Sequence, residues 1–224
     1  MHFADSLRAN LNRPDLLLAW GLLVIAAIWM LVRDLRRHNP EIGGLMKWVW
    51  TFTVAYSGPL GLAIYYYSGR KQIARDSLWR RAFRSVAHCY SGCGAGEIAG
   101  VLIAAGLFSL GNWGIAVLSF ALAYVAGFAL TVGPLMQEGM GLRQALWDAL
   151  YSETASITAM ELAAIGVDLW LAGRATIVEP LFWSSLVVSL TAGLAAAYPV
   201  NVLLILLGVK EGMHSPRELA GNSA

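Results

Sequence analysis

Charged residues are scarce in this sequence. Only 13% of its 224 residues are charged and 58% are hydrophobic, whereas typical soluble domains carry about 25% charged residues. The mean hydropathy is +0.59. This composition excludes a soluble globular protein and predicts a chain embedded in a lipid bilayer, which is its expected partner.

Cysteines and recognisable catalytic motifs are also few. The two cysteines, Cys89 and Cys93, lie four residues apart, a poor spacing for a structural disulfide within one helix. The sequence contains no Gly-x-Ser-x-Gly, no His-Glu-x-x-His and no phosphate-binding loop. These absences favour a role that is not enzymatic. The net charge of +2 comes from residues that flank apolar runs, so we expect no nucleic-acid partner.

Long apolar runs, in contrast, are abundant. Six of them have about the 20 residues needed to cross a bilayer. They cover residues 16–32, 48–67, 87–110, 113–136, 146–172 and 181–208. The first run lacks a signal-peptide cleavage site, so we expect it to be retained. The sequence predicts an all-α polytopic bundle of about six transmembrane helices, with an N-terminal anchor helix and loop (1–47), a membrane bundle (48–214) and a short tail (215–224).

Basic residues are distributed unevenly between the predicted connections. Residues 69–86 carry six of them around an apolar face, which predicts one basic interfacial helix on an anionic leaflet. With six spans, 11 lysines and arginines fall on one side of the membrane and 5 on the other. The positive-inside rule then places both termini in the cytoplasm, in the inner (cell) membrane of a bacterium.

Glycine and proline predict two local features of helix packing. Gly58-Pro59 interrupts the second apolar run, and a proline there should kink the helix and free a backbone carbonyl. Gly92, Gly96 and Gly100 form a seam at helical spacing, which would let another helix approach closely. The seam is also the expected contact for a homo-oligomer.

The most unusual polar groups open the third run. Cys89, Cys93 and Glu97 fall within a narrow stripe of one helix, because they occupy positions i, i+4 and i+8. His88 immediately precedes the stripe at the expected membrane surface. Two thiols, an imidazole and a carboxylate in one place indicate a site.

The fifth and sixth runs contribute the other polar groups. The fifth contains Glu153, Thr154, Met160 and Glu161, and the sixth contains Asn201 shortly after a proline. Carboxylates inside a membrane are costly and should face the bundle interior or a wet cavity. Counting inward at 1.5 Å per residue places Glu97 and Glu153 at a similar depth of about 10–15 Å in the same leaflet.

If these groups meet, their chemistry favours a metal. The candidate ligands are His88, Cys89, Cys93, Glu97, Glu153, Met160 and Glu161, with Thr154 and Asn201 as further polar groups. Thiolate, imidazole and thioether select Cu(I) or Zn(II), and a cation would offset the burial of the carboxylates. We therefore expect binding, and movement, of a transition-metal cation.

Three other interpretations remain open. In a proton-coupled transporter of another small solute, Glu97, Glu153 and Glu161 would relay protons. In a thiol redox protein, Cys89 and Cys93 would cycle between oxidation states. In a membrane scaffold without transport, the carboxylates would only bind neighbouring helices through hydrogen bonds.

Several stretches resemble a bacterial family of small multi-pass membrane proteins known mainly as a domain of unknown function. The matching stretches are Trp50 to Tyr65 with Gly58-Pro59-Leu60, His88-Cys89, Glu153-Thr154-Ala155-Ser156-Ile157-Thr158, Tyr198-Pro199-Val200-Asn201 and Gly208-Val209-Lys210-Glu211-Gly212-Met213. The resemblance implies an integral membrane protein with these motifs as its hallmark, and members often carry Asp where Glu153 stands. It implies no activity, and the first apolar run lies outside it.

Overall fold

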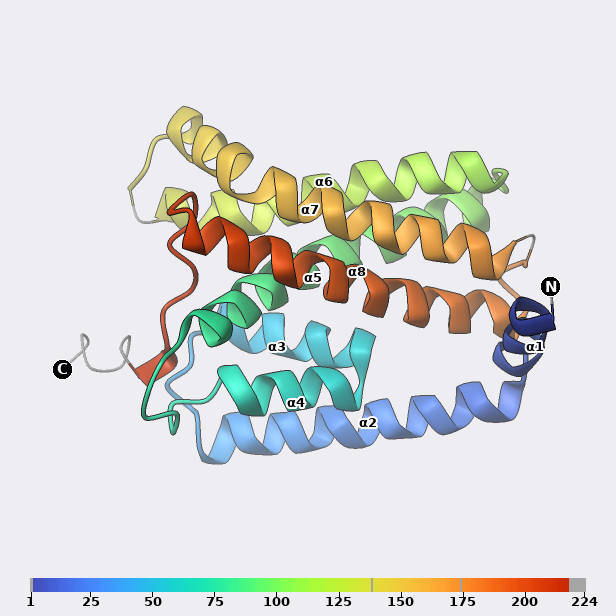
Figure 1. The fold of residues 1–224 in the computed structure, drawn as a ribbon, viewed down its shortest axis with the longest axis horizontal. Coiled ribbons are helices and arrows are strands. Elements are labelled where there is room, and N and C mark those ends of the chain that lie inside the picture. Colours follow the sequence, from blue (N-terminus) through green and yellow to red (C-terminus); the bar gives the residue numbers. More distant parts are fainter. Residues whose placement is uncertain (1, 138, 174, 218–224) are drawn as a thin grey trace.

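The computed structural model describes residues 2–137, 139–173 and 175–217, and helices dominate it. Its elements are α1 (His2–Leu11), α2 (Pro14–Arg37), α3 (Gly44–Ser57), α4 (Pro59–Ser68), α5 (Leu78–Val101), the π-helix η1 (Leu102–Leu107), α6 (Asn112–Gln137), α7 (Leu142–Ala172) and α8 (Pro180–Leu206). Figure 1 shows the long helices lying side by side along one axis. The predicted all-α membrane bundle is confirmed.

Five helical segments are long and apolar enough to cross a membrane: α2, α5 with η1, α6, α7 and α8. The most extensive packing joins α5 to α6 and α7 to α8, and α5 also packs on α8. The N-terminal anchor helix α2 is part of this bundle, because its Ala27, Leu31 and Leu35 are buried in the main hydrophobic core.

The predicted second span is instead a helical hairpin formed by α3 and α4. Gly58 between them has φ 56° and ψ −130°, a conformation that glycine adopts without a steric penalty, and Pro59 starts α4. The rings of Trp50 and Tyr65 lie 5.3 Å apart, whereas one continuous helix would separate these residues by about 22 Å. The chain therefore enters and leaves on the same side (Figure 1), and the prediction of a kinked crossing over 48–67 is wrong.

The open end of this hairpin is fastened to α2 by Asp34. The buried Asp34 carboxylate accepts hydrogen bonds from Arg70 Nη2 at 2.8 Å, from the Tyr65 hydroxyl at 2.8 Å and from Asn39 Nδ2 at 2.8 Å. His38 Nδ1 lies 3.2 Å from the same carboxylate. These contacts join the last turn of α2 to the end of α4 and to the loop that follows it.

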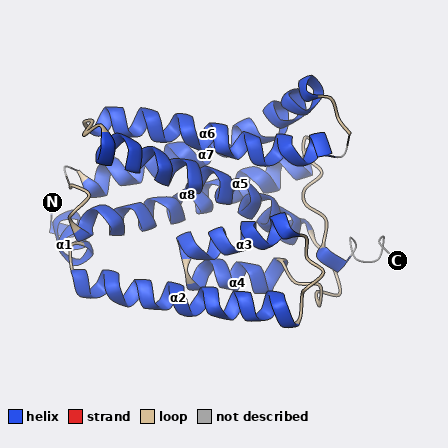
Figure 2. Cartoon of the chain, turned by 180° about the vertical axis from the view of Figure 1, so that it is seen from behind, coloured by secondary structure: helices blue, strands red, loops and turns tan. Residues whose placement is uncertain are grey.

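The two termini lie at opposite ends of the bundle (Figure 2). At the N-terminal end, the backbone N–H of Leu181 in the first turn of α8 donates to Asn12 Oδ1 at 3.2 Å. At the C-terminal end, the chain leaves α8 after Leu206. The hairpin turns back, so the five segments long enough to cross a membrane are an odd number, whereas the sequence predicted six crossings and both termini on one face.

The expected interfacial helix is also absent from residues 69–86 as the structure describes them. Residues 78–86 form the first turns of α5, and Arg84 is only 1% exposed. Its guanidinium donates to Met213 O at 2.9 Å, to Ser68 O at 3.0 Å and to Asp76 Oδ2 at 2.5 Å. These acceptors compensate the buried charge of Arg84, so the basic segment can be part of α5. The helix therefore begins at Leu78, nine residues before the predicted start at residue 87.

The glycine seam packs α5 directly against α6. A Cβ at Gly96 would lie 2.3 Å from the Leu122 carbonyl oxygen, and one at Gly100 would lie 2.4 Å from Ser119 Cα. A Cβ at Gly92 would lie 3.1 Å from the Ala126 carbonyl oxygen of α6, a less close approach. The predicted close approach is confirmed, but α6 of the same chain covers the seam. A second copy therefore cannot use it, which corrects the expected oligomer contact.

Candidate functional site

Titratable side chains follow α5 and α7 from one end of the bundle to the other. The two helices run in the same direction, since α6 lies between them in the chain and returns in the opposite direction (Figure 1). From the C-terminal end toward the N-terminal end, α5 carries His88, Cys89, Cys93 and Glu97, and α7 carries Glu153, Glu161 and Asp168. We call these seven residues the polar row.

The row begins at the C-terminal end with a buried ion pair. Lys210 Nζ lies 2.6 Å from Glu153 Oε1, and both side chains are nearly inaccessible. Lys210 Nζ also donates to Asn201 Oδ1 at 3.1 Å, and the Asn201 amide donates to the Ser156 hydroxyl. The motif of the fifth run and that of the sixth run thus meet through Lys210, which sequence reasoning did not include in the site.

The positioning of Lys210 depends on the turn that ends α8. Gly208 has φ 70°, and the Lys210 N–H donates back to Leu204 O at 3.3 Å. The chain therefore folds back over the end of α8. The sequence does hold a signal for this ion pair. Lys210 is a lone lysine next to the last apolar run, and the predicted bundle contains an intramembrane glutamate that needs a partner.

His88 and the two cysteines form the next part of the row. His88 is 9% exposed, its Nε2 lies 3.1 Å from Leu130 O of α6, and it interacts electrostatically with Glu153 and Lys210. Cys89 Sγ and Cys93 Sγ are 3.9 Å apart, and both are buried free thiols. The imidazole is therefore in electrostatic range of the ion pair, and the two thiols follow it on the same helix.

Glu161 occupies the middle of the row. It is fully buried, at 0% exposure, and neither of its carboxyl oxygens has a hydrogen-bond partner among the described residues. Its carboxyl group interacts electrostatically with Glu97 and with Cys89. An unpaired carboxylate in a dry interior is strongly unfavourable, so Glu161 is the group in the bundle that most requires a functional explanation.

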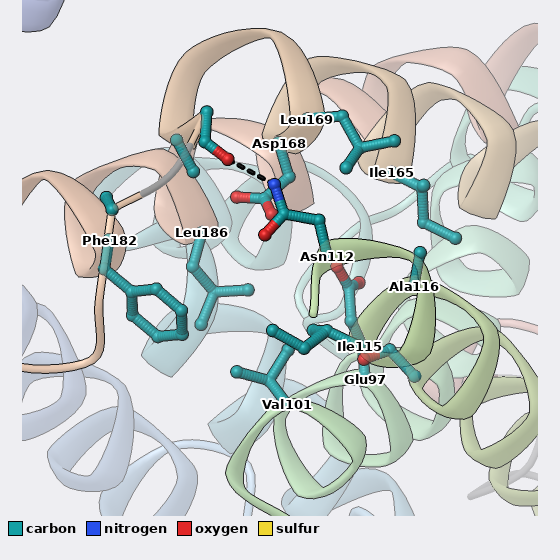
Figure 3. Close-up of a pocket in the computed structure, with 14 residues that line it drawn as sticks. Glu97, Val101, Asn112, Ile115, Ala116, Ile165, Asp168, Leu169, Phe182 and Leu186 are labelled. Atoms are coloured by element: carbon teal, nitrogen blue, oxygen red, sulfur yellow. Dashed lines mark hydrogen bonds between the residues drawn. The ribbon is translucent and has the colours of Figure 1, made fainter. Parts of the chain in front are cut away.

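The row ends in a cavity near the N-terminal end. Glu97, Asp168 and Asn112 line this cavity of about 40 Å³ (Figure 3). Ser119 lines it as well. Asp168 Oδ1 accepts a hydrogen bond from the Ser185 hydroxyl at 2.7 Å. Asp168, which was not among the residues predicted for the site, is therefore part of it.

The predicted metal ligands are spread along the bundle. Glu97 lines the same cavity as Asp168 and is not at the depth of Glu153, because α5 starts at Leu78 and Glu97 is therefore much further along the helix than expected. Within the described ranges, no group of three or more His, Cys, Asp or Glu side chains is placed to hold one metal ion.

Two further predicted residues serve packing and helix geometry. Met160 lies against Gly193 of α8, where a Cβ would be 3.0 Å from Met160 Cγ. The Thr154 hydroxyl donates to Leu150 O of its own helix at 2.5 Å. Neither side chain belongs to the polar row.

Comparison with known proteins identifies a family. A model of the family described as "Domain of unknown function (DUF4396)" matches residues 78–210. The matched residues run from the start of α5 to Lys210, so they include the whole polar row, whereas α2 and the α3–α4 hairpin lie outside them. No curated protein and no solved structure matches the chain.

Proposed function

The chain belongs to the DUF4396 family, and within that family of unknown function we propose that it acts as a proton-coupled membrane transporter. The polar row supplies the proton path, and Glu161 is its central carrier. The substrate class that moves with the protons is a small solute.

The observation that carries this proposal is the unpartnered carboxyl group of Glu161 in the middle of a row of titratable groups. A carboxyl group in that position can exist in a protonated, neutral form. It lies within electrostatic range of Glu97 toward one end and of Cys89 toward the other. Intramembrane carboxylates and histidines in such chains are the usual components of proton relays.

The ends of the row differ in a way that suits a relay. At the C-terminal end, Glu153 is paired with Lys210 at 2.6 Å, so its negative charge is compensated there. At the N-terminal end, Glu97 and Asp168 share a cavity with no basic side chain among its described lining residues. The two ends of the polar row therefore present different electrostatic environments to a proton.

The first test is proton flux through purified protein in liposomes. Proton flux is driven by an imposed membrane potential and followed with a pH-sensitive dye. Glu161→Gln should reduce this flux by about 100-fold, as expected when a positioned proton-transfer group is removed. Glu41→Gln is the matched control, because it makes the same chemical change at an exposed side chain outside the bundle. Equal flux in wild type, Glu161→Gln and protein-free liposomes would overturn the proposal.

The orientation that we propose follows from the distribution of positive charge. Of the fifteen lysines and arginines that the structure describes, thirteen lie at the C-terminal end of the bundle, and only Arg8 and Arg13 lie at the N-terminal end. For the same fifteen residues the six-span arrangement gives 11 on one side and 4 on the other, so the distribution of 13 and 2 is more asymmetric. By the positive-inside rule, the C-terminus is cytoplasmic and the N-terminus is on the outer face of a bacterial inner membrane.

Reporter fusions test this orientation in cells. A reporter active only in the cytoplasm should be active when fused after residue 217 and inactive when fused before residue 2, and a reporter active only outside the cytoplasm should show the opposite pattern. A fusion in the loop between α4 and α5 should report the same side as the C-terminus, because the hairpin returns to that side. The same result for both termini would contradict the arrangement of five crossings.

A second candidate function, transition-metal handling, is favoured by the spacing of the two thiols. The Cys89–Cys93 Sγ separation of 3.9 Å is close to the distance of about 3.8 Å between two thiolates on one tetrahedral zinc at 2.3 Å each. Elemental analysis separates the two candidates. Near-stoichiometric copper or zinc, lost in the Cys89→Ser/Cys93→Ser double variant and retained in Glu161→Gln, would favour metal handling over the proton relay.

A further inference from the structure

The cavity at the N-terminal end of the polar row has an unusual lining. Four helices surround it, and four of its lining side chains carry oxygen atoms: Glu97 from α5, Asn112 and Ser119 from α6, and Asp168 from α7. The carboxyl groups and the amide converge on the same space (Figure 3). No lining residue within the described chain is a lysine, arginine or histidine. The cavity therefore offers two carboxyl groups, an amide and a hydroxyl to whatever enters it.

Ser119 provides evidence that is independent of the carboxylates. Its side chain is 2% exposed, and its Oγ has no hydrogen-bond partner among the described residues. Other buried serines near this end are satisfied, since the Ser185 hydroxyl donates to Asp168 Oδ1 at 2.7 Å. A buried hydroxyl normally finds a partner, so the Ser119 oxygen is available to a ligand in the cavity.

Neighbouring contacts hold two of the other oxygen-bearing side chains, Asn112 and Asp168. The Asn112 side-chain N–H₂ donates to the Gly173 carbonyl, which leaves its carbonyl oxygen as the group available to the cavity. The hydrogen bond from Ser185 holds the Asp168 carboxylate in place. The π-helix η1 begins at Leu102, directly after the lining residue Val101, and such π-helical segments often occur at functional sites.

We propose that this cavity binds a small, hard cation through oxygen atoms of Glu97, Asp168, Ser119 and Asn112. Hard cations prefer carboxylate, carbonyl, hydroxyl and water oxygens. A cavity of about 40 Å³ has room for one such ion with at most one or two waters. Na⁺ and Mg²⁺ are both hard cations that bind such oxygen ligands. They differ in charge, and therefore in how fully they neutralise two carboxylates.

This inference rests on the proposed function in one respect only: the bound cation would be the ion exchanged against protons at the outer end of the row. Binding itself can be measured without transport. The two ideas can therefore fail separately.

The test is thermal unfolding of the purified protein in detergent, followed by fluorescence of its nine tryptophans. Choline chloride keeps the ionic strength constant while NaCl, KCl or MgCl₂ is added. At a tenfold excess over Kd, Na⁺ or Mg²⁺ should raise Tm by about 3–5 °C relative to choline. A larger response to Mg²⁺ identifies a divalent ligand, and a response to Na⁺ without one to Mg²⁺ identifies a monovalent ligand.

Two variants and a matched control test whether the effect of the ion on Tm depends on this cavity. Ser119→Ala and Asp168→Asn should each remove the ion-dependent rise in Tm. Ser85→Ala should keep it, because Ser85 is also a buried serine of the bundle whose Oγ lacks a partner among the described residues, but it does not line the cavity. Equal shifts in Ser119→Ala and Ser85→Ala, or no ion effect in wild type, would overturn the inference.

A last comparison separates this inference from the proton relay. Glu161→Gln should lose proton flux and retain the ion-dependent rise in Tm, since Glu161 does not line the cavity. If wild type shows flux but no ion effect, the cation site is wrong and the relay stands. If it shows the ion effect but no flux, the relay is wrong and the cation site stands.

Discussion

Replacing Asp34 with alanine is expected to lower the free energy of unfolding by about 3–5 kcal/mol, the usual effect of removing one partner from a buried ion pair. Arg70 would lose its carboxylate, and the buried Tyr65 hydroxyl and Asn39 amide would lose their acceptor. Each polar group left unsatisfied in the interior adds to the destabilisation. Equilibrium unfolding in mixed detergent micelles measures this effect.

The control for Asp34→Ala is Glu41→Ala, which removes an ion pair from the same end of the molecule. Glu41 Oε1 lies 2.6 Å from Lys71 Nζ, but both side chains are substantially exposed, and exposed pairs contribute little to stability. Hydrogen exchange should show that the extra loss in Asp34→Ala is concentrated in α3 and α4. A loss no larger than that of Glu41→Ala would show that Asp34 does not hold the hairpin.

Replacing Gly96 with alanine is expected to destabilise the bundle by about 3 kcal/mol, at the upper end of overpacking effects. The added Cβ would lie 2.3 Å from the Leu122 carbonyl oxygen and 2.6 Å from Ala123 Cα. Both contacts are with the backbone of α6, so no side-chain rotation can relieve them. The helices α5 and α6 must move apart, which loosens the packing on either side of Glu97.

Gly166→Ala is the matched control on α7. A Cβ at Gly166 would meet nothing within 4 Å, and alanine is a better helix former than glycine by about 1 kcal/mol. Denaturant unfolding should therefore show a small gain in stability for Gly166→Ala and a large loss for Gly96→Ala. Similar changes in both would mean that the α5–α6 seam is looser than the structure shows.

The features that could be predicted from the sequence are those set by composition and local spacing. The shortage of charge predicted the membrane bundle, and the spacing of Gly92, Gly96 and Gly100 predicted a close helix contact. The intramembrane carboxylates of α5 and α7 were correctly expected to avoid the lipid, since Glu97, Glu153 and Glu161 are all buried. In each of these cases the residues themselves, with their neighbours along the helix, carry the information.

The features that could not be predicted depend on contacts between distant parts of the chain. Gly58-Pro59 is compatible with a kink or with a reversal, and the ties from Asp34 to Tyr65 and Arg70, 31 and 36 residues away, fix the reversal. Arg84 looked like a surface charge because its acceptors, Ser68 O and Met213 O, belong to distant segments. An error in the start of α5 then misplaced Glu97 along the bilayer normal.

The hairpin also constrains how the protein is made. Its first arm, α3, has 14 residues and is about 21 Å long, which is shorter than the hydrocarbon core of about 30 Å. The insertion machinery therefore need not translocate the segment after it. With the proposed orientation, the basic end of α2, around Arg36 and Arg37, and the basic loop that follows α4 would both stay in the cytoplasm. Because the hairpin returns to the side from which it starts, the basic segments before and after it need not cross the bilayer.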